Sequence, residues 1–183
     1  MFLNKSLKRK LLRVYSDNGF EIFEYSPSFL HLFLYSFEPL TFQRRVRFLL
    51  ELLKGYKVYY LVHSDEIVAY CVISRGGGRY NFAGKNDIVV GPYFVIEEHR
   101  GKHYSEQLVS FLLNYPKITY RYAYDWIRYD NIPSIRCAEK VGFYKVDSMD
   151  MVGPFRILRI CHDHVGDYWL FKFNNIKNEN SNN

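Results

Sequence analysis

The hydrophobic spacing of this chain changes at Glu98. Before that residue, the segment 87–98 is a long run of residues that favour β-strands. After it, apolar residues recur at the i, i+3, i+4 and i+7 spacing of an amphipathic helix, at Leu108, Phe111, Leu112 and Tyr115. A strand that leads directly into a helix predicts a fold in which strands and helices share a core.

The strand before Glu98 contains Gly91-Pro92 in its middle. Proline donates no hydrogen bond to a neighbouring strand, so a central strand accommodates it only at an irregularity. We therefore expect a bulge at this pair and a break in the strand pairing there.

The first elements of the chain are predicted from the same spacing rules. Residues 4–15 have leucines at near-helical spacing and predict a helix, and residues 20–25 predict a short strand. A second helix begins after Thr41, which is a suitable N-cap, and ends at Gly55.

Two runs rich in Val, Ile and Tyr follow, separated by two residues, and predict an antiparallel hairpin of residues 57–64 with residues 67–74. The next segment, Gly76-Gly77-Gly78, lacks the Gly-Lys-Ser/Thr ending of a P-loop. It therefore predicts a mobile loop between two strands rather than a phosphate site.

The helix after Glu98 ends at Pro116, and residues 118–126 predict the next strand. The helix that follows is marked at both ends: Asn131 is a good N-cap, Pro133 lies in the first turn, and Gly142 can adopt the left-handed conformation after the last turn. Late strands are predicted at 143–151, 155–161 and 167–173, and the Asn-rich tail 174–183 is predicted to be disordered.

Composition limits the class of protein. The chain has 183 residues, 48% of them hydrophobic and 19% aromatic, so residues 1–173 are predicted to form one domain, and disorder, collagen and coiled coil are disfavoured. The sequence contains no stretch of about 18 uncharged apolar residues, so no membrane span is predicted. Three widely spaced cysteines, and a basic N-terminus without an apolar signal segment, favour a cytoplasmic location.

The net charge of +6 suits an anionic partner without saying whether it is nucleic acid, lipid or a phosphorylated cofactor. The basic N-terminal segment and Arg44, Arg45 and Arg47 could form a cationic patch of the kind that binds nucleic acid or a membrane surface. No RNP, KH or zinc-finger signature accompanies them, and basic side chains often only solvate a helix. Nucleic acid is therefore the rival partner and not the expected one.

A basic turn joins the strand before Glu98 to the helix after it: Arg100-Gly101-Lys102-His103-Tyr104-Ser105. The first amides of a helix have no partner within it, and the helix dipole favours negative charge there. Arg100 and Lys102 add cations, so this turn could hold a pyrophosphate. On this segment alone, a solvated basic turn is the alternative.

A second segment, residues 131–143, reads Asn-Ile-Pro-Ser-Ile-Arg-Cys-Ala-Glu-Lys-Val-Gly-Phe. Together, the two segments resemble the GCN5-related N-acetyltransferase (GNAT) superfamily. Its members pair an Arg/Gln-x-x-Gly-x-Gly/Ala turn after the fourth strand with a later Asn-x-x-Ser/Ala helix that ends in Glu-Lys-x-Gly-Phe. The segments occur in the family's order, and the predicted strands match its layout over residues 20–173.

The resemblance implies an α/β domain of the α+β type. Its mixed, mainly antiparallel twisted sheet would have about six to seven strands flanked by about four helices, with the fourth and fifth strands splayed apart to admit acetyl-CoA. It also implies an N-acetyltransferase in which an amine attacks the thioester directly. The implied cofactor-binding residues are Phe94, Val95, Arg100, Gly101, Lys102, His103, Tyr104, Ser105 and Asn131.

Three positions depart from the family pattern. His103 stands where glycine is usual, and it could either crowd a pyrophosphate or donate a hydrogen bond to it. Ser105 replaces a Gly or Ala, which is a mild change. Ala138 occupies a position where many members carry the tyrosine that reprotonates the leaving thiolate, so the usual general acid is absent.

An amine must lose its proton before it can attack a thioester, so a carboxylate or a histidine should act as general base. Asp87 at the start of the fourth strand and Glu97 near its end are the candidates by position, with a solvated strand end as the alternative for each. Tyr129 or Tyr124 could protonate the departing thiolate, and so could water.

The segment Cys161-His162-Asp163-His164 contains metal-ligand residue types. A structural zinc site normally needs four ligands at recognisable spacing, and no CxxC partner accompanies this segment. It is therefore interpreted as a polar turn between strands, and no metal site is predicted.

These observations predict an acetyl-CoA-dependent N-acetyltransferase that acts on the amine of a small molecule. The acceptor pocket would come from residues 26–43 and the glycine loop, where Phe29, Phe33, Tyr35 and Phe37 either line it or, as we prefer, fill the core. Protein amino groups and hydroxyl groups remain possible acceptors. Two other functional classes also remain: a family member that binds CoA without catalysis, and a basic nucleic-acid-binding module. Whether the chain forms a homodimer stays open.

Overall fold

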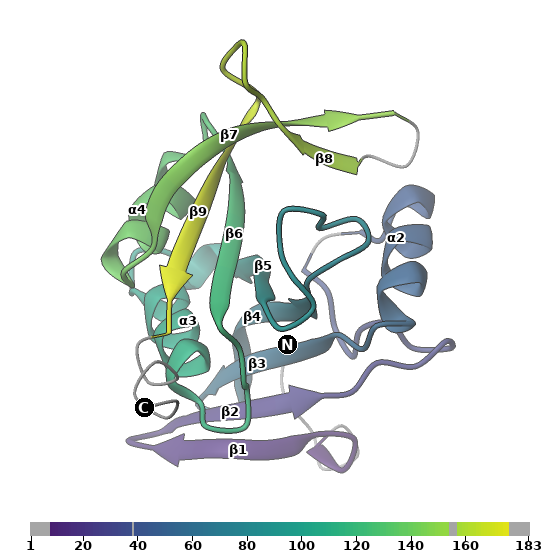
Figure 1. The fold of residues 1–183 in the computed structure, drawn as a ribbon. Helices are drawn as coiled ribbons and strands as arrows, with labels where there is room; N and C mark the ends of the chain where they lie inside the picture. The colour runs from purple at the N-terminus through teal and green to yellow at the C-terminus, as the bar shows by residue number, and fades with distance from the viewer. Residues whose placement is uncertain (1–7, 38, 154–156, 176–183) are drawn as a thin grey trace, which may run out of the picture. The chain divides into compact units, whose positions relative to one another are not determined.

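The computed structural model describes residues 8–37, 39–153 and 157–175. These residues form nine strands, the helices α2, α3 and α4, and a turn of 3-10 helix, η1. Figure 1 labels the strands and the three α-helices. Contacts within the chain separate two compact units, and each is described by itself. The first unit holds the described residues up to Ser74 together with Pro92–Leu108, and the second holds Arg75–Gly91 and the described residues from Val109 onward.

The first unit contains four strands in the order β1-β2-β3-β4, and their pairings are antiparallel. The strands are β1 (Leu12–Asp17), β2 (Phe20–Tyr25), β3 (Lys57–His63) and β4 (Glu66–Arg75). The predictions of β2 and of the β3–β4 hairpin are confirmed.

The helix predicted over residues 4–15 is wrong at its end, where the structure has strand β1. Residues 12–15 of that segment are in the strand, and residues 4–7 lie outside the described residues. A tight turn at Asn18 and Gly19, both at positive φ, folds the segment back onto β2 as a hairpin. Pairing with β2 therefore overrides the helical spacing of the leucines.

Helix α2 (Phe42–Leu52) begins directly after Thr41, the predicted N-cap. Thr41 Oγ1 accepts a hydrogen bond from the Arg44 backbone N–H at 3.3 Å. Phe48 on this helix is 2% exposed and packs edge-on against Phe33, with 4.8 Å between ring centroids. The helix thus covers the aromatic core of the first unit.

The segment before α2 is held by tyrosine hydroxyl groups of that core. Tyr56 donates a hydrogen bond to the Leu32 carbonyl at 2.7 Å, and Tyr60 donates one to the Tyr35 carbonyl at 2.8 Å. The core interpretation is confirmed for Phe33, Tyr35 and Phe37, which pack against the buried cluster. Phe29, by contrast, is exposed.

Strand β5 (Ile88–Val95) contributes to both units, and the change falls between Gly91 and Pro92. Gly91 has a φ of +107°, which L side chains rarely adopt. The parallel pairing of β5 with β6 (Tyr122–Arg128) joins Ile88 to Ala123 and Val89 to Tyr124, and among the described residues it extends no further along β5. The predicted break in strand pairing is therefore confirmed between β5 and β6. Strand β6 itself begins at Tyr122, later than the predicted start at residue 118.

The second unit places its strands in the order β5-β6-β9-β7-β8. Strands β7 (Tyr144–Val152), β8 (Ile157–Ile160) and β9 (Tyr168–Asn174) pair antiparallel with their neighbours, close to the predicted positions. Asn174 belongs to β9 and not to the tail, and the rest of the predicted disordered tail, apart from residue 175, lies outside the described residues.

Helices α3 (Tyr104–Asn114) and α4 (Ile132–Lys140) also lie where predicted. Asn131 Oδ1 caps α4 by accepting a hydrogen bond from the Ser134 backbone N–H at 3.3 Å. Gly142 follows the last turn with a φ of +98°, and a Cβ there would lie 3.3 Å from the Phe173 ring. Local sequence therefore defines both ends of α4.

The architecture is the predicted mixed α+β class, because every described pairing except that of β5 with β6 is antiparallel. The described strands number nine rather than six to seven, with β1 and β8 at the ends of the two orders. None of the helices in the described part of the chain is long and apolar enough to cross a membrane. The single domain expected over residues 1–173 stays a prediction.

Candidate functional site

The predicted site residues divide between the two units. The cofactor-binding candidates from Phe94 to Ser105 belong to the first unit. Asp87, Tyr129 and Asn131 belong to the second unit. The geometry around each group is therefore described within its own unit.

The predicted phosphate turn connects η1 (Glu97–His99) to α3. Gly101 and His103 have φ values of +78° and +60°, and a Cβ at Gly101 would meet no atom within 4 Å. The His103 carbonyl accepts a hydrogen bond from the Gln107 N–H at 3.0 Å, which makes His103 the residue that starts the helix. Four backbone amides thus precede the first amide that donates a hydrogen bond within the helix. They belong to His103, Tyr104, Ser105 and Glu106.

The two cations of this turn have different surroundings. The Arg100 guanidinium carbon lies 5.4 Å from the centroid of the Phe94 ring, within the range of a cation–π contact. Lys102 Nζ lies 3.3 Å from His99 Nδ1, and His99 Nε2 lies 3.5 Å from a carboxylate oxygen of Glu66. The Lys102 ammonium can donate a hydrogen bond to His99 Nδ1, while His99 Nε2 faces Glu66.

His103 adopts the left-handed conformation that explains why glycine is usual at this position. Its Nδ1 lies 3.0 Å from Glu106 Oε2, so the ring is held by the first turn of α3. The side chain is exposed. The backbone of this turn therefore keeps the glycine-like shape even though a histidine occupies it.

Tyr104 and Ser105 differ in what they can offer to a phosphate. Tyr104 is 7% exposed, and its ring packs near Phe20, His63 and His99. Its side chain is thus part of the packing, which leaves its backbone amide as the group available to a ligand. Ser105 is half-buried.

The amides of Phe94 and Val95 point to opposite edges of β5. The Ile96 amide donates a hydrogen bond to the Val68 carbonyl of β4 at 3.0 Å. Since alternate amides of an extended strand point the same way, the Phe94 amide also points toward β4, and the Val95 amide points away from it. Of the two, Val95 is the one that can face a ligand.

Asp87 is 7% exposed and both of its carboxylate oxygens have backbone partners. Oδ2 accepts a hydrogen bond from the Gly84 N–H at 2.7 Å, and Oδ1 accepts one from the Tyr122 N–H at 3.1 Å. Glu97, the other candidate base, is exposed at the start of η1. Its side chain is therefore the more accessible of the two carboxylates.

Tyr129 lies between the end of β6 and the start of α4, and it is 54% exposed. Its backbone N–H donates a hydrogen bond to the Asp167 carbonyl at 3.1 Å, which fixes the chain at this point. Arg128 and Asp130 on either side form a two-bond ion pair, and Arg128 holds the pKa of the Asp130 carboxyl below its usual range. Tyr129 thus has an accessible phenol on a fixed backbone.

Tyr124, the alternative proton donor, is a poorer candidate by geometry. It is 9% exposed, and its ring packs edge-on against Phe82 at 5.7 Å. Burial, followed by the nearby Asp87 charge, raises the pKa of Tyr124 above its ordinary value.

Sequence reasoning missed Glu66, which contacts His99 and through it orients Lys102 in this turn. Glu66 is the first residue of β4 and lies more than 30 positions from the turn along the chain. No local spacing could have connected them, because hairpin folding brings Glu66 to this place.

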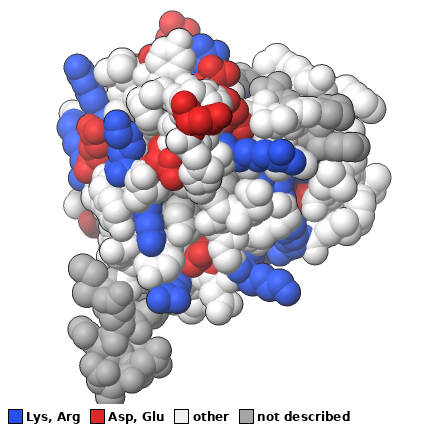
Figure 2. Space-filling model, turned by 45° about the horizontal axis from the view of Figure 1, so that its top comes forward, with Lys and Arg blue, Asp and Glu red and all other residues white. Residues whose placement is uncertain are grey.

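Figure 2 shows the charges on one face of the molecule. Lys and Arg side chains occur there in separate groups, with Asp, Glu and uncharged surface between them.

Residues 21–143, more than half of the chain, match the family model described as Acetyltransferase (GNAT) family. The matched range includes β5, the predicted phosphate turn and α4. No curated protein matches the sequence.

Three solved structures have a similar fold. One is yncA, a putative acetyltransferase from Salmonella typhimurium with its cofactor acetyl-CoA, at 18% identity, a TM-score of 0.52 and 72% coverage of each chain. A GNAT-family acetyltransferase from Bacillus anthracis has 14% identity and a TM-score of 0.51, over 72% of this chain and 73% of that one. One from Streptococcus pneumoniae has 9% identity and a TM-score of 0.50, over 72% and 74%. At these identities the likeness concerns the fold alone.

Proposed function

This chain belongs to the acetyltransferase (GNAT) family, and from that membership we propose that it moves an acetyl group from acetyl-CoA to the amine of a small molecule. The enzyme class, an N-acetyltransferase, and the acetyl donor follow from the family. The acceptor class, the roles of individual residues and a cytoplasmic location are the parts that we propose. The three free cysteines, Cys71, Cys137 and Cys161, support a reducing compartment.

The observation that carries the proposal is the turn before α3. Gly101 and His103 at positive φ lead into a helix whose first amides have no intrahelical acceptor. Such amides and the positive end of the helix dipole suit the diphosphate of coenzyme A. Arg100 and Lys102 would add charge to this site, with the Tyr104 and Ser105 amides as donors.

Val95 is the proposed partner of the thioester. Its amide points away from β4, so it can donate a hydrogen bond to the thioester oxygen. When the amine attacks the carbonyl carbon, that oxygen becomes an oxyanion, and a fixed N–H donor stabilises it. Phe94 would instead contribute through its ring, which stacks near Arg100. Asn131 is proposed at the cofactor arm in addition to its observed cap.

Proton transfer needs two further groups. The amine nitrogen must give up a proton before it bonds to the acetyl carbon, and Glu97 is the more accessible base, with Asp87 as the second candidate. The tetrahedral intermediate then expels the CoA thiolate. Tyr129 is the proposed donor of the proton that the thiolate takes up, because its phenol is exposed and Ala138 offers none.

Calorimetric titration of the full chain with acetyl-CoA tests the donor site. Arg100→Ala and Lys102→Ala should each weaken binding about 10- to 100-fold, because a hydrogen bond to a charged group contributes roughly 1.5–3 kcal/mol. Lys85→Ala removes an exposed cation of the second unit and serves as the matched control. Wild-type affinity in both turn variants would contradict the phosphate role.

A thiol-release assay over a panel of amines tests the acceptor. Release with a small amine, and none with a lysine peptide or an alcohol, is the expected result. Tight acetyl-CoA binding without release against any acceptor would favour the non-catalytic alternative, for which the buried Ala138 is the reason. Nucleic-acid binding that falls steeply with salt and is not displaced by CoA would favour the basic module.

A further inference from the structure

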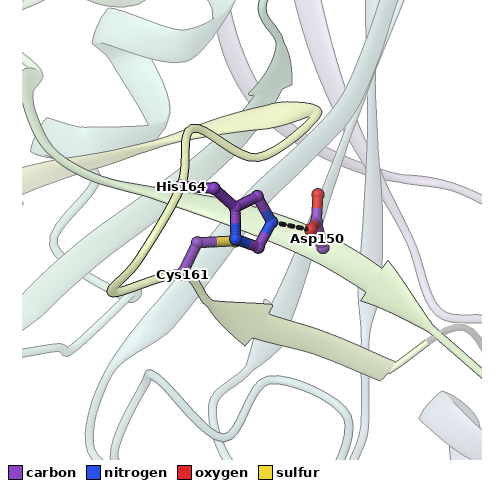
Figure 3. Close-up of side chains that lie close together, drawn as sticks. All are labelled: Asp150, Cys161 and His164. Atoms are coloured by element: carbon purple, nitrogen blue, oxygen red, sulfur yellow. Dashed lines mark hydrogen bonds and ion pairs between the residues drawn. The ribbon is translucent and has the colours of Figure 1, made fainter.

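Three side chains with metal-binding atoms converge in the second unit, outside the residues used above (Figure 3). Asp150 lies in β7, Cys161 follows β8 directly, and His164 lies in the loop before β9. One ligand atom of each lies within 4.8 Å of the other two. His164 Nε2 and Asp150 Oδ2 are 2.6 Å apart.

The loop that carries Cys161 and His164 is fixed on β7 by backbone hydrogen bonds. The Cys161 N–H donates to the Ser148 carbonyl at 2.9 Å, and the Gly166 N–H donates to Ser148 Oγ at 3.3 Å. A Cβ at Gly166 would lie 2.4 Å from the Met149 carbonyl oxygen and 2.8 Å from Cys161 Sγ. Only glycine allows the loop to approach this closely, so the three side chains are positioned before any ligand arrives.

The outer atoms of the cluster are also held. His164 Nδ1 lies 3.0 Å from Asp163 Oδ1, and Asp150 Oδ1 accepts a hydrogen bond from the Asp167 N–H at 2.9 Å. A histidine that binds a metal through one nitrogen usually donates its other N–H to a carboxylate in this way. His164 Nε2 and Asp150 Oδ2 face each other, and Cys161 provides the third ligand atom of the converging group.

We propose that Asp150, Cys161 and His164 bind one zinc ion. Thiolate, imidazole and carboxylate are the ligands that zinc prefers, and three protein ligands leave a fourth position for water. Ligand atoms around a tetrahedral zinc lie about 3.3–3.6 Å apart, so Asp150 and His164 would separate by somewhat less than 1 Å. The Cys161 thiol proton and any proton on His164 Nε2 would be released to solvent. This site is independent of the acetyl-transfer proposal.

The sequence segment alone did not reveal this site, because its third ligand, Asp150, lies on another strand. His162, the other histidine of the segment, is exposed and is not part of the converging group. It therefore provides a matched control for His164.

Titration with zinc chloride, and substitution by Co²⁺, test the proposal on the full chain. One ion should bind per chain, and the Co²⁺ form should show a thiolate-to-metal charge-transfer absorption that Cys161→Ser abolishes. His164→Gln and Asp150→Asn should remove measurable zinc binding, while His162→Gln should keep it. Asp163→Asn should weaken binding about 10- to 100-fold, as changes in outer partners of metal-bound histidines do.

Circular dichroism of each variant separates lost binding from lost folding. His164 is exposed, so its variant is expected to fold even if Cys161→Ser does not. The proposal is overturned if the folded wild-type chain takes up no zinc at millimolar concentration, or if His164→Gln binds as tightly as the wild type. Equal losses in His162→Gln and His164→Gln would also overturn the assigned ligand set.

Discussion

The Asp87 carboxylate accepts a hydrogen bond from the Tyr122 backbone amide at 3.1 Å. This bond joins the residue before β5 to the first residue of β6, next to the parallel pair of Ile88 with Ala123. The second oxygen of Asp87 fixes Gly84 in the preceding loop at 2.7 Å. Asp87 thus aligns the two parallel strands at the point where their pairing begins.

Asp87→Asn should lower the free energy of unfolding by about 1–3 kcal/mol, because one carboxylate acceptor becomes an NH₂ group that faces a backbone donor in a partly buried place. Urea denaturation measures this, and Glu98→Gln, an exposed carboxylate nearby in sequence, is the control. A variant with wild-type stability but slow acetyl transfer would instead identify Asp87 as the general base.

Glu97 and Tyr129 should have different effects on the kinetics of acetyl transfer. Glu97→Gln should lower kcat/KM about 10²- to 10⁴-fold, the usual contribution of a general base. Tyr129→Phe should lower kcat and leave acetyl-CoA binding unchanged, because the phenol acts after the cofactor has bound. Wild-type turnover of both variants would contradict both assigned roles.

His103→Gly and His103→Ala provide a matched pair of variants. Both remove the contact of the ring with Glu106, so their difference in stability isolates the backbone. Because residue 103 has a φ of +60°, the glycine variant should be more stable than the alanine variant by about 1 kcal/mol. Thermal unfolding measures the difference, and equal stabilities would show that the left-handed conformation is not maintained.

The parts of the fold that could be predicted are those fixed by local chemistry. Thr41 and Asn131 accept hydrogen bonds from amides three residues later, and Gly142 has the positive φ expected after a helix. Such caps act within one turn of chain, so the sequence around them is sufficient. The basic turn at residues 100–105 and α4 occur in the order typical of the family, and this order can be read directly from the sequence.

The parts that could not be predicted depend on partners distant in sequence. Residues 12–15 form a strand because β2 pairs with them. Likewise, Asp150 meets His164 because β7, β8 and the following loop fold over one another. The spacing of residues within a short segment cannot predict contacts with residues that are distant in the sequence.

The Tyr60 hydroxyl has three backbone partners. It donates to the Tyr35 carbonyl at 2.8 Å and accepts hydrogen bonds from the Leu34 and Tyr35 amides at 3.1 and 3.0 Å. Tyr60→Phe would leave these groups without their partner in a buried place, so it should lower the free energy of unfolding by about 1–3 kcal/mol. Hydrogen exchange at the Leu34 and Tyr35 amides should become faster, and protection equal to the wild type would contradict the role.

Tyr60 should also make the protein sensitive to alkaline pH. Burial raises the pKa of Tyr60 well above its ordinary value of 10.0, even though the bonds from Tyr35 and Leu34 act in the opposite direction. Below about pH 10 the phenol is neutral in both folded and unfolded chains, so its contribution is complete there. Above that pH, the unfolded chain loses the proton while the folded chain keeps it, and the free energy of unfolding falls by up to about 1.4 kcal/mol per pH unit for this group.

Burial also raises the pKa of Tyr56 and of Tyr120, so part of the decline remains in Tyr60→Phe. Urea denaturation between pH 9 and 11 should therefore give a shallower decline for Tyr60→Phe than for the wild type, and parallel declines would show that Tyr60 ionises normally in the folded protein.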